Sequence, residues 1–107
     1  MTSDHTVAAV DIGTNSTNLL IVDERGDEIE RRVTVTRLGK NLAATGELAE
    51  ESISATLTTL ADYATLIRER SAQRILVTAT EACRRARNAA PFIDQARAIL
   101  GVEPEVV

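Results

Sequence analysis

The chain has 107 residues and a mass of 11.5 kDa, which is the size of one domain. Twelve Lys and Arg against 16 Asp and Glu give a net charge of −4, and 44% of the residues are hydrophobic. These values argue against a disordered tail and against general nucleic-acid binding through basic charge. No apolar run approaches the roughly 20 residues of a membrane span, so we expect a cytoplasmic protein without a membrane partner.

The single His and the single Cys argue against two kinds of site. One Cys excludes an intrachain disulfide, and without a second His or Cys at ligand spacing a structural zinc site cannot form. A Cys–His nucleophile pair would need His5, which lies in residues 1–6, a stretch that we expect to be disordered. We predict that Cys83 is a small buried residue without a redox role.

Three apolar runs joined by short turns predict three strands in an antiparallel meander, at residues 7–12, 18–23 and 28–37. The first run is nearly continuous and ends at Gly13, a pattern typical of a central strand covered on both faces. In the third run Ile29, Val33 and Val35 alternate with polar residues, which indicates a strand with one apolar face.

The remainder alternates helix and strand. A polar loop at 39–47 precedes apolar residues at helical spacing, which predict a helix from about Glu50 to Arg70. The elements expected after it are a strand at 74–79, a turn with a short basic helix at 80–88, a helix that stops at Gly101, and a strand that begins at Glu105 and is cut off by the chain end. The order βββαβαβ requires crossover helices and parallel pairing, so a mixed α/β sheet with helices packed on it is predicted.

The segment 11–17 (DIGTNST) is more polar than a hairpin turn needs. Gly13 can adopt a positive φ, which would let successive backbone N–H groups point toward one site. Four side chains add uncharged donors around it, namely Thr14, Asn15, Ser16 and Thr17. Three or four such donors suit a phosphate oxyanion, even without a nearby lysine.

Asp11, at the start of this segment, cannot be a direct phosphate ligand when it is ionised. It could bind Mg²⁺ through water or position an attacking water, because hard cations prefer carboxylate oxygens and keep much of their hydration. The alternative interpretation of the segment is a hairpin loop whose Asp and Asn side chains make local turn hydrogen bonds.

A second candidate segment, 80–88 (TEACRRARN), follows a buried strand and carries Arg84, Arg85 and Arg87. Ligands of open α/β sheets bind beyond the carboxyl ends of the strands, where an Arg can grip a phosphate through its planar fork. In a helix that begins near Ala82, Arg84 and Arg87 would share a side. The alternative is a solvated basic helix face.

Three motifs in order resemble the exopolyphosphatase and guanosine pentaphosphate phosphohydrolase (Ppx/GppA phosphatase) family. VAAVDIGTNSTNLLIV resembles the family's strand, D-[IL]-G-[ST]-N-S loop and second strand. TRLGKNLAATGELAEESI is similar to its R-L-G … G-x-L-x-x-E-[AS]-I passage, and LVTATEACRRARN is similar to its A-T-x-x-x-R-x-A-x-N passage. The resemblance covers about residues 7 to 107.

The resemblance implies an actin-like, ribonuclease H-like α/β domain that cleaves terminal phosphates from polyphosphate or guanosine pentaphosphate, usually with Mg²⁺ and as a homodimer when full length. It assigns phosphate binding to the loop and to Arg84, and a water-mediated Mg²⁺ contact to Asp11; the loop residues are Gly13, Thr14, Asn15 and Ser16. Two positions depart from the family pattern: Glu81 stands where many members have a small hydroxyl residue, and Asn18 stands where Arg or His is frequent.

The resemblance also implies that the family's general-base Glu lies beyond Val107, in a G-[EN]-E-E-A-R motif. We therefore interpret residues 1–107 as the N-terminal subdomain of such a phosphatase and expect the chain alone to be inactive. Two other functions remain open from the sequence. One is an ATP-dependent phosphotransferase of the same superfamily, and the other is a non-catalytic module that binds polyphosphate or a guanosine alarmone.

Overall fold

The computed structural model describes residues 5–107. Most of the segment that we expected to be disordered, residues 1–4, lies outside this range. For Thr6 the expectation is wrong, because its side chain is buried. The carbonyl oxygen of Thr6 accepts hydrogen bonds from the backbone N–H groups of Gln73, at 2.8 Å, and Arg74, at 3.4 Å. These bonds tie the start of the chain to the start of a later strand.

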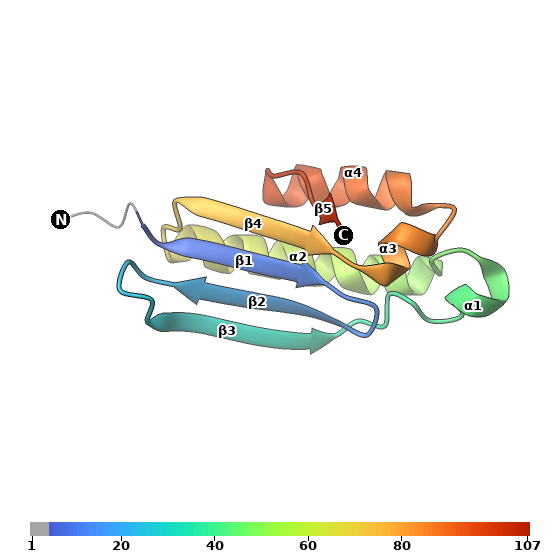
Figure 1. Ribbon diagram of the computed structural model, residues 1–107, viewed down its shortest axis with the longest axis horizontal. Helices are drawn as coiled ribbons and strands as arrows, with labels where there is room; N and C mark the ends of the chain where they lie inside the picture. Colours follow the sequence, from blue (N-terminus) through green and yellow to red (C-terminus); the bar gives the residue numbers. More distant parts are fainter. Residues whose placement is uncertain (1–4) are drawn as a thin grey trace.

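The described residues form five strands and four helices, in the order β1 (Val7–Ile12), β2 (Ser16–Val22), β3 (Glu28–Val35), α1 (Leu42–Thr45), α2 (Glu50–Glu69), β4 (Arg74–Ala79), α3 (Glu81–Arg85), α4 (Ala89–Leu100) and β5 (Glu105–Val106) (Figure 1). Each predicted element is present, with ends within about two residues of those expected. Only α1, one turn inside the predicted loop, was not foreseen.

The strands form one mixed sheet in the order β3-β2-β1-β4-β5. β1 pairs antiparallel with β2, which pairs antiparallel with β3, whereas β4 runs parallel to β1 and to β5. β1 therefore lies at the centre, and its carboxyl end, the β1–β2 connection and the segment after β4 meet at one end of the sheet (Figure 1).

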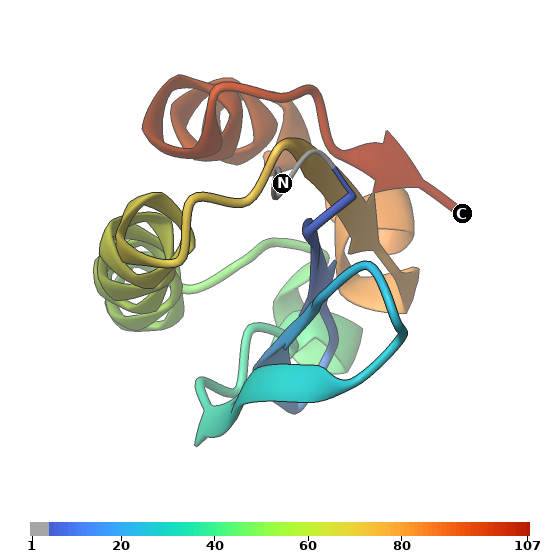
Figure 2. The same ribbon diagram turned by 90° about the vertical axis from the view of Figure 1, so that its left-hand side faces the viewer.

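Helices α2 and α4 lie side by side on one face of the sheet (Figure 2). α2 forms where expected because its apolar residues share one side, and Leu60, Ala64 and Ile67 are buried there. Glu50 and Glu51 in its first turn and Arg68 in its last favour the helix dipole. α4 contributes Phe92 and ends at Gly101, whose φ of 77° is a left-handed cap that suits glycine.

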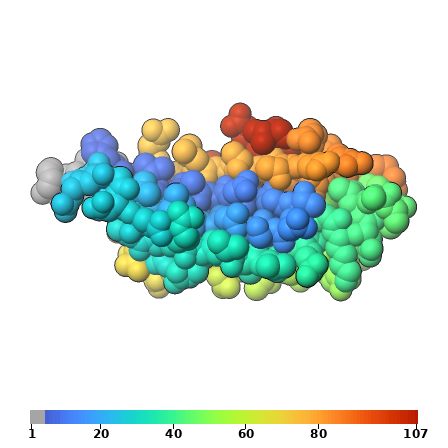
Figure 3. All heavy atoms as spheres, turned by 60° about the horizontal axis from the view of Figure 1, so that its bottom comes forward, coloured from blue at the N-terminus to red at the C-terminus, as the bar shows by residue number. Residues whose placement is uncertain are grey.

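The other face of the sheet is open in the described chain, so the prediction that β1 is covered on both faces is wrong. Ala9, on the open face of β1, is exposed, while its neighbours Ala8 and Val10 are buried on the covered face. Figure 3 shows β1, β2 and β3, coloured blue to teal, uncovered across a broad surface.

In β3, polar side chains face the core and apolar side chains face the open side, which is the reverse of an ordinary half-buried strand. Val33 and Val35, 64% and 65% exposed, lie on the open face, while Glu30 and Thr36 point toward the helices and are buried. The polar groups are satisfied there, because the Glu30 carboxylate accepts two hydrogen bonds from the guanidinium of Arg70 and pairs with Arg32. Ion pairing thus allows a charged side chain on the buried face.

Among residues 5–107, no helix is long and apolar enough to span a membrane.

Candidate phosphate-binding site

The β1–β2 connection, residues 13–15, is a tight turn between paired strands. β1 and β2 remain in register up to Ile12 and Thr17, and the Gly13 N–H donates to the Ser16 carbonyl at 3.0 Å. Gly13 does not have a positive φ, so that prediction is wrong. A Cβ on Gly13 would lie 2.9 Å from the Ser16 carbonyl oxygen, so glycine is required here for close approach.

The turn rests on the segment that follows β3. The Asn15 carbonyl accepts the N–H groups of Thr36, at 3.1 Å, and Arg37, at 2.9 Å. The Thr14 carbonyl accepts the N–H of Gly39 at 2.9 Å. Three backbone hydrogen bonds therefore fix the turn against residues about 20 positions further along the chain.

This docking leaves hydrogen-bond donors free on the turn. A peptide C=O and the N–H of the next residue point in opposite directions, so the Asn15 N–H points away from the segment that the Thr14 carbonyl contacts. Within the described chain, the backbone N–H groups of Thr14 and Asn15 have no hydrogen-bond acceptor. The side chains of Thr14, Asn15 and Ser16 also make no hydrogen bond to another described residue.

Thr17 is not one of these donors, contrary to the prediction. Its side chain is fully buried on the helix face of the sheet, and its hydroxyl is hydrogen-bonded to the Thr36 hydroxyl at 2.9 Å. The Thr17 carbonyl accepts a 2.7 Å hydrogen bond from the Tyr63 hydroxyl of α2. Thr17 therefore anchors the turn to the core.

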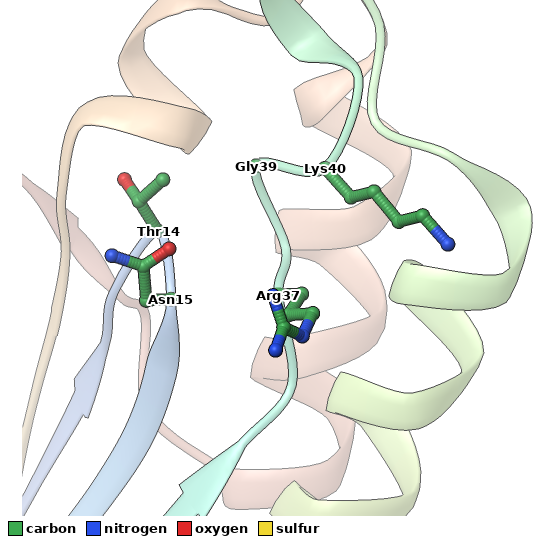
Figure 4. A pocket seen from close by; sticks show the side chains of 5 residues that line it. All are labelled: Thr14, Asn15, Arg37, Gly39 and Lys40. Atoms are coloured by element: carbon green, nitrogen blue, oxygen red, sulfur yellow. The ribbon is translucent and has the colours of Figure 1, made fainter.

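A cavity of about 290 Å³ opens beside the turn, lined by Thr14, Asn15, Arg37, Gly39 and Lys40. Figure 4 shows Thr14 and Asn15 on one side of it and the segment from Arg37 to Lys40 on the other. The position of the two cations beside the turn could not be predicted from the sequence, since they follow the loop by more than 20 residues. The one sequence feature that could have indicated it is the R-L-G-K run at residues 37–40, because its Gly39 is the residue that contacts the turn.

Asp11 lies on the open face of β1, at the edge of a second hollow of about 280 Å³. One carboxylate oxygen, Oδ1, accepts a 3.0 Å hydrogen bond from the Thr78 hydroxyl of β4. Asn18 stands opposite Asp11 on β2, and its Oδ1 is buried without a hydrogen-bond partner among the described residues. The floor between these polar groups is apolar, formed in part by Leu20 and Leu76.

The three arginines that follow β4 make their contacts away from the β1–β2 turn. The Arg84 guanidinium donates to the main-chain oxygen of Val107, and Arg85 pairs with Glu81 of the same helix at 2.8 Å. α3 ends at Arg85, so Arg87 does not share a helical side with Arg84 as predicted, and it pairs instead with Glu47 at 3.4 Å. Neither the turn cavity nor the open-face hollow is lined by Arg84.

Cys83 is buried, as predicted. Burial raises the pKa of its thiol to about 11. A thiol that holds its proton this strongly is a poor nucleophile at neutral pH.

Residues 21–107 match the Ppx/GppA phosphatase family. Among curated proteins, the chain is 40% identical over 102 residues to exopolyphosphatase 2 of Mycobacterium tuberculosis, a match that covers 89% of this chain and 32% of the relative. It is 31% identical over 103 residues to the guanosine-5'-triphosphate,3'-diphosphate pyrophosphatase of Photobacterium profundum, with 94% of this chain and 21% of that protein covered. The chain therefore spans a third or less of the length of these relatives.

Among solved structures, the chain is similar to the Ppx/GppA family member of Aquifex aeolicus, with a TM-score of 0.90 and 37% identity. The match covers 96% of this chain and 35% of that one. The predicted fold class, an actin-like α/β domain with a mixed sheet, is confirmed by this likeness.

Proposed function

Because the chain belongs to the Ppx/GppA phosphatase family, we propose that it is the phosphate-binding, N-terminal part of a phosphohydrolase. The substrate class is inorganic polyphosphate or guanosine pentaphosphate, which the names of the two curated relatives suggest. The observation that carries the proposal is the β1–β2 turn, whose donors at Thr14, Asn15 and Ser16 have no hydrogen-bond partner among the described residues.

In this proposal the turn holds the terminal phosphate. The free N–H groups of Thr14 and Asn15, the Asn15 side-chain amide and the Ser16 hydroxyl donate to its oxygens, and the backbone bonds to residues 36–39 keep the turn in place before the substrate arrives. Preorganised donors stabilise the charge that collects on the equatorial oxygens during in-line attack by water. Arg84 is proposed to supply a further donor by exchanging its contact with Val107 for a phosphate oxygen.

Asp11 fits a role in holding Mg²⁺ through water. Its Oδ1 accepts from Thr78, and its second oxygen, Oδ2, accepts no hydrogen bond from another described residue. Residues 5–107 contain no cluster of three or more His, Cys, Asp or Glu that could enclose a metal. Mg²⁺ commonly keeps several waters and is held by one carboxylate together with substrate phosphates, so a single carboxylate suffices. When bound there, the ion would neutralise charge on the transferred phosphoryl group.

Hydrolysis is favoured over the two alternative functions by specific observations. Both curated relatives carry the names of phosphate-cleaving enzymes rather than of phosphotransferases. A module that only binds phosphate would not need a carboxylate beside its anion site, since a negative charge there weakens anion binding. Asp11 lies two residues before Gly13, the first residue of the turn, near the end of β1.

The proposal is tested by titrating the chain with inorganic phosphate in a calorimeter. An Asn15→Ala, Ser16→Ala double variant is expected to lower the affinity by about tenfold or more, because charge-assisted hydrogen bonds contribute roughly 1.5–3 kcal/mol each. Thr65→Ala is the matched control, since it removes an exposed hydroxyl on α2 that bonds only to its own helix and to Arg68. Equal affinity in the double variant and the control would contradict the proposal.

A further inference from the structure

Arg37 stands in a backbone conformation that few side chains adopt. Its φ is 53°, in the left-handed region, where a residue other than Gly, Asn or Asp is strained. Its N–H is one of the donors to the Asn15 carbonyl, so this strained conformation is tied directly to the phosphate turn. Strain of this kind concentrates at functional sites.

The Arg37 guanidinium is free of acidic partners in the described chain. Six other arginines form ion pairs there, namely Arg31, Arg32, Arg70, Arg85, Arg87 and Arg97. Arg37 forms none within 4.0 Å among residues 5–107, although acidic residues outnumber basic ones in the sequence by 16 to 12. Its charge is therefore available to an anion in the cavity beside the turn.

Lys40 is held only loosely. Its Nζ lies 3.5 Å from a carboxylate oxygen of Glu51, and both side chains are exposed. Figure 4 shows the Lys40 side chain extending away from Thr14, toward α2. Exposed pairs of this length contribute about 0–1 kcal/mol, so Lys40 can leave Glu51 for a stronger anion.

Arg37 and Lys40 also line a second, smaller hollow of about 180 Å³. This hollow continues toward the start of α2, where its wall includes Glu51 and Ser52. The two hollows therefore share Arg37 and Lys40, and only the first is also lined by the turn residues Thr14 and Asn15.

We propose that Arg37 and Lys40 bind the phosphate units of a linear polyphosphate that follow the unit held by the turn, and that Glu51 competes with the substrate for Lys40. This inference rests on the proposed function, since it takes the turn as the site of the terminal phosphate. The chemistry of the cavity wall favours a plain polyanion over a nucleotide. Its wall, made by Thr14, Asn15, Arg37, Gly39 and Lys40, contains no aromatic or large aliphatic side chain on which a purine could stack.

The experiment compares inorganic monophosphate with inorganic tripolyphosphate as calorimetric ligands of the chain at low salt. Arg37→Asn removes the charge and keeps a residue that tolerates a positive φ. It is expected to lower tripolyphosphate affinity by about tenfold, and Lys40→Gln by about threefold, while monophosphate affinity changes less than twofold in both. Glu51→Gln is expected to raise tripolyphosphate affinity about twofold by releasing Lys40.

Arg25→Gln is the matched control, because Arg25 is an exposed arginine in the β2–β3 turn, at the other end of the sheet. It should leave both affinities unchanged. Equal losses for monophosphate and tripolyphosphate in Arg37→Asn and Lys40→Gln would place both cations at the terminal phosphate and overturn the inference. The absence of any loss would overturn it as well.

Failure of the inference can be separated from failure of the proposed function. If only the proposed phosphate contacts of Arg37 and Lys40 are wrong, the Asn15→Ala, Ser16→Ala variant still loses monophosphate binding. Arg37→Asn and Lys40→Gln then bind tripolyphosphate normally. If the turn is not the phosphate site, the double variant binds monophosphate normally, whatever Arg37 and Lys40 do.

Discussion

The carbonyl oxygen of Thr14 accepts the N–H of Gly39 at 2.9 Å, and this contact joins the phosphate turn to the segment that carries the two cations. A Cβ on Gly39 would overlap the Cγ2 methyl of Thr14. A side chain at position 39 would therefore force either the Thr14 side chain to rotate or the turn to move away from the segment with the two cations.

Gly39→Ala is expected to displace the turn, to destabilise the fold by about 1–3 kcal/mol and to weaken phosphate binding. Urea unfolding and phosphate titration measure the two effects. Gly26→Ala is the control: Gly26 has a φ of 85° but no neighbouring atom within 4 Å of an added Cβ. It should cost about 1–2 kcal/mol through backbone strain alone and leave phosphate binding intact. Normal phosphate affinity in Gly39→Ala would show that the turn does not depend on this contact.

Most of the strands and helices could be predicted, because their periodicity is local. The face of β3 could not. Its alternation of Val33 and Val35 with polar residues indicates two unlike faces but does not say which is buried, and in the structure Glu30 and Thr36 are buried while the valines are exposed. The buried Glu30 has its partner 40 residues away, at Arg70, the residue that follows α2. A local pattern carries no information about such a partner.

The candidate site, like the fold, could be predicted from the sequence only in part. The turn residues Asn15 and Ser16 were identified from their own polarity, since a hairpin needs fewer donors. Arg37 and Lys40 could not be placed beside them, because only the pairing of β2 with β3 brings the end of β3 to the turn. Gly13 was recognised as necessary, but for the wrong reason, since its steric contact with the Ser16 carbonyl becomes visible only in three dimensions.

Arg84 and Arg85 are adjacent in α3 but are expected to differ in function. Arg84→Ala should lower the affinity of the chain for inorganic phosphate by about tenfold, equivalent to about 1.4 kcal/mol, if its guanidinium moves from Val107 to the ligand. Arg85→Ala should change the affinity by less than about threefold, because Arg85 is paired with Glu81 on the exposed side. Equal effects in a calorimetric titration would mean that Arg84 belongs to a diffuse basic surface.

Glu30 is expected to be the most important carboxylate for stability. Its side chain is buried, and it accepts hydrogen bonds from Nε and Nη2 of Arg70 at 3.2 and 2.8 Å. Glu30→Gln should destabilise the chain by about 1.5–3 kcal/mol in urea unfolding, since charged hydrogen bonds are lost on the buried side of β3. Glu28→Gln removes an exposed carboxylate paired with Arg31, and it should leave the unfolding midpoint unchanged. Similar midpoints for the two variants would rule out a stabilising role for the buried pair.

Cys83 is expected to make the fold sensitive to alkaline pH. Burial raises the pKa of its thiol from 9.0 to about 11, so the unfolded chain loses this proton at a lower pH than the folded chain. Unfolding then releases a proton between these values, and the free energy of unfolding falls as the pH rises from 9.0 to about 11. Burial also raises the pKa of Tyr63, which adds to the fall.

Urea unfolding across this range, repeated with Cys83→Ala, isolates the thiol. The variant is expected to be less stable at neutral pH, because a buried group is lost, but to show a flatter decline toward high pH. Parallel curves for the variant and the parent chain would show that the thiol does not contribute.

The central claim is that the β1–β2 turn binds phosphate, and amide NMR of the chain during titration with inorganic phosphate tests it most directly. The Thr14 and Asn15 N–H groups, which have no acceptor among the described residues, should show the largest saturable shifts. The amide of Gly26, already bonded to the Asp23 carbonyl at 2.9 Å in the distant β2–β3 turn, should stay unchanged. Saturable shifts centred elsewhere, or none at Thr14 and Asn15, would contradict the account.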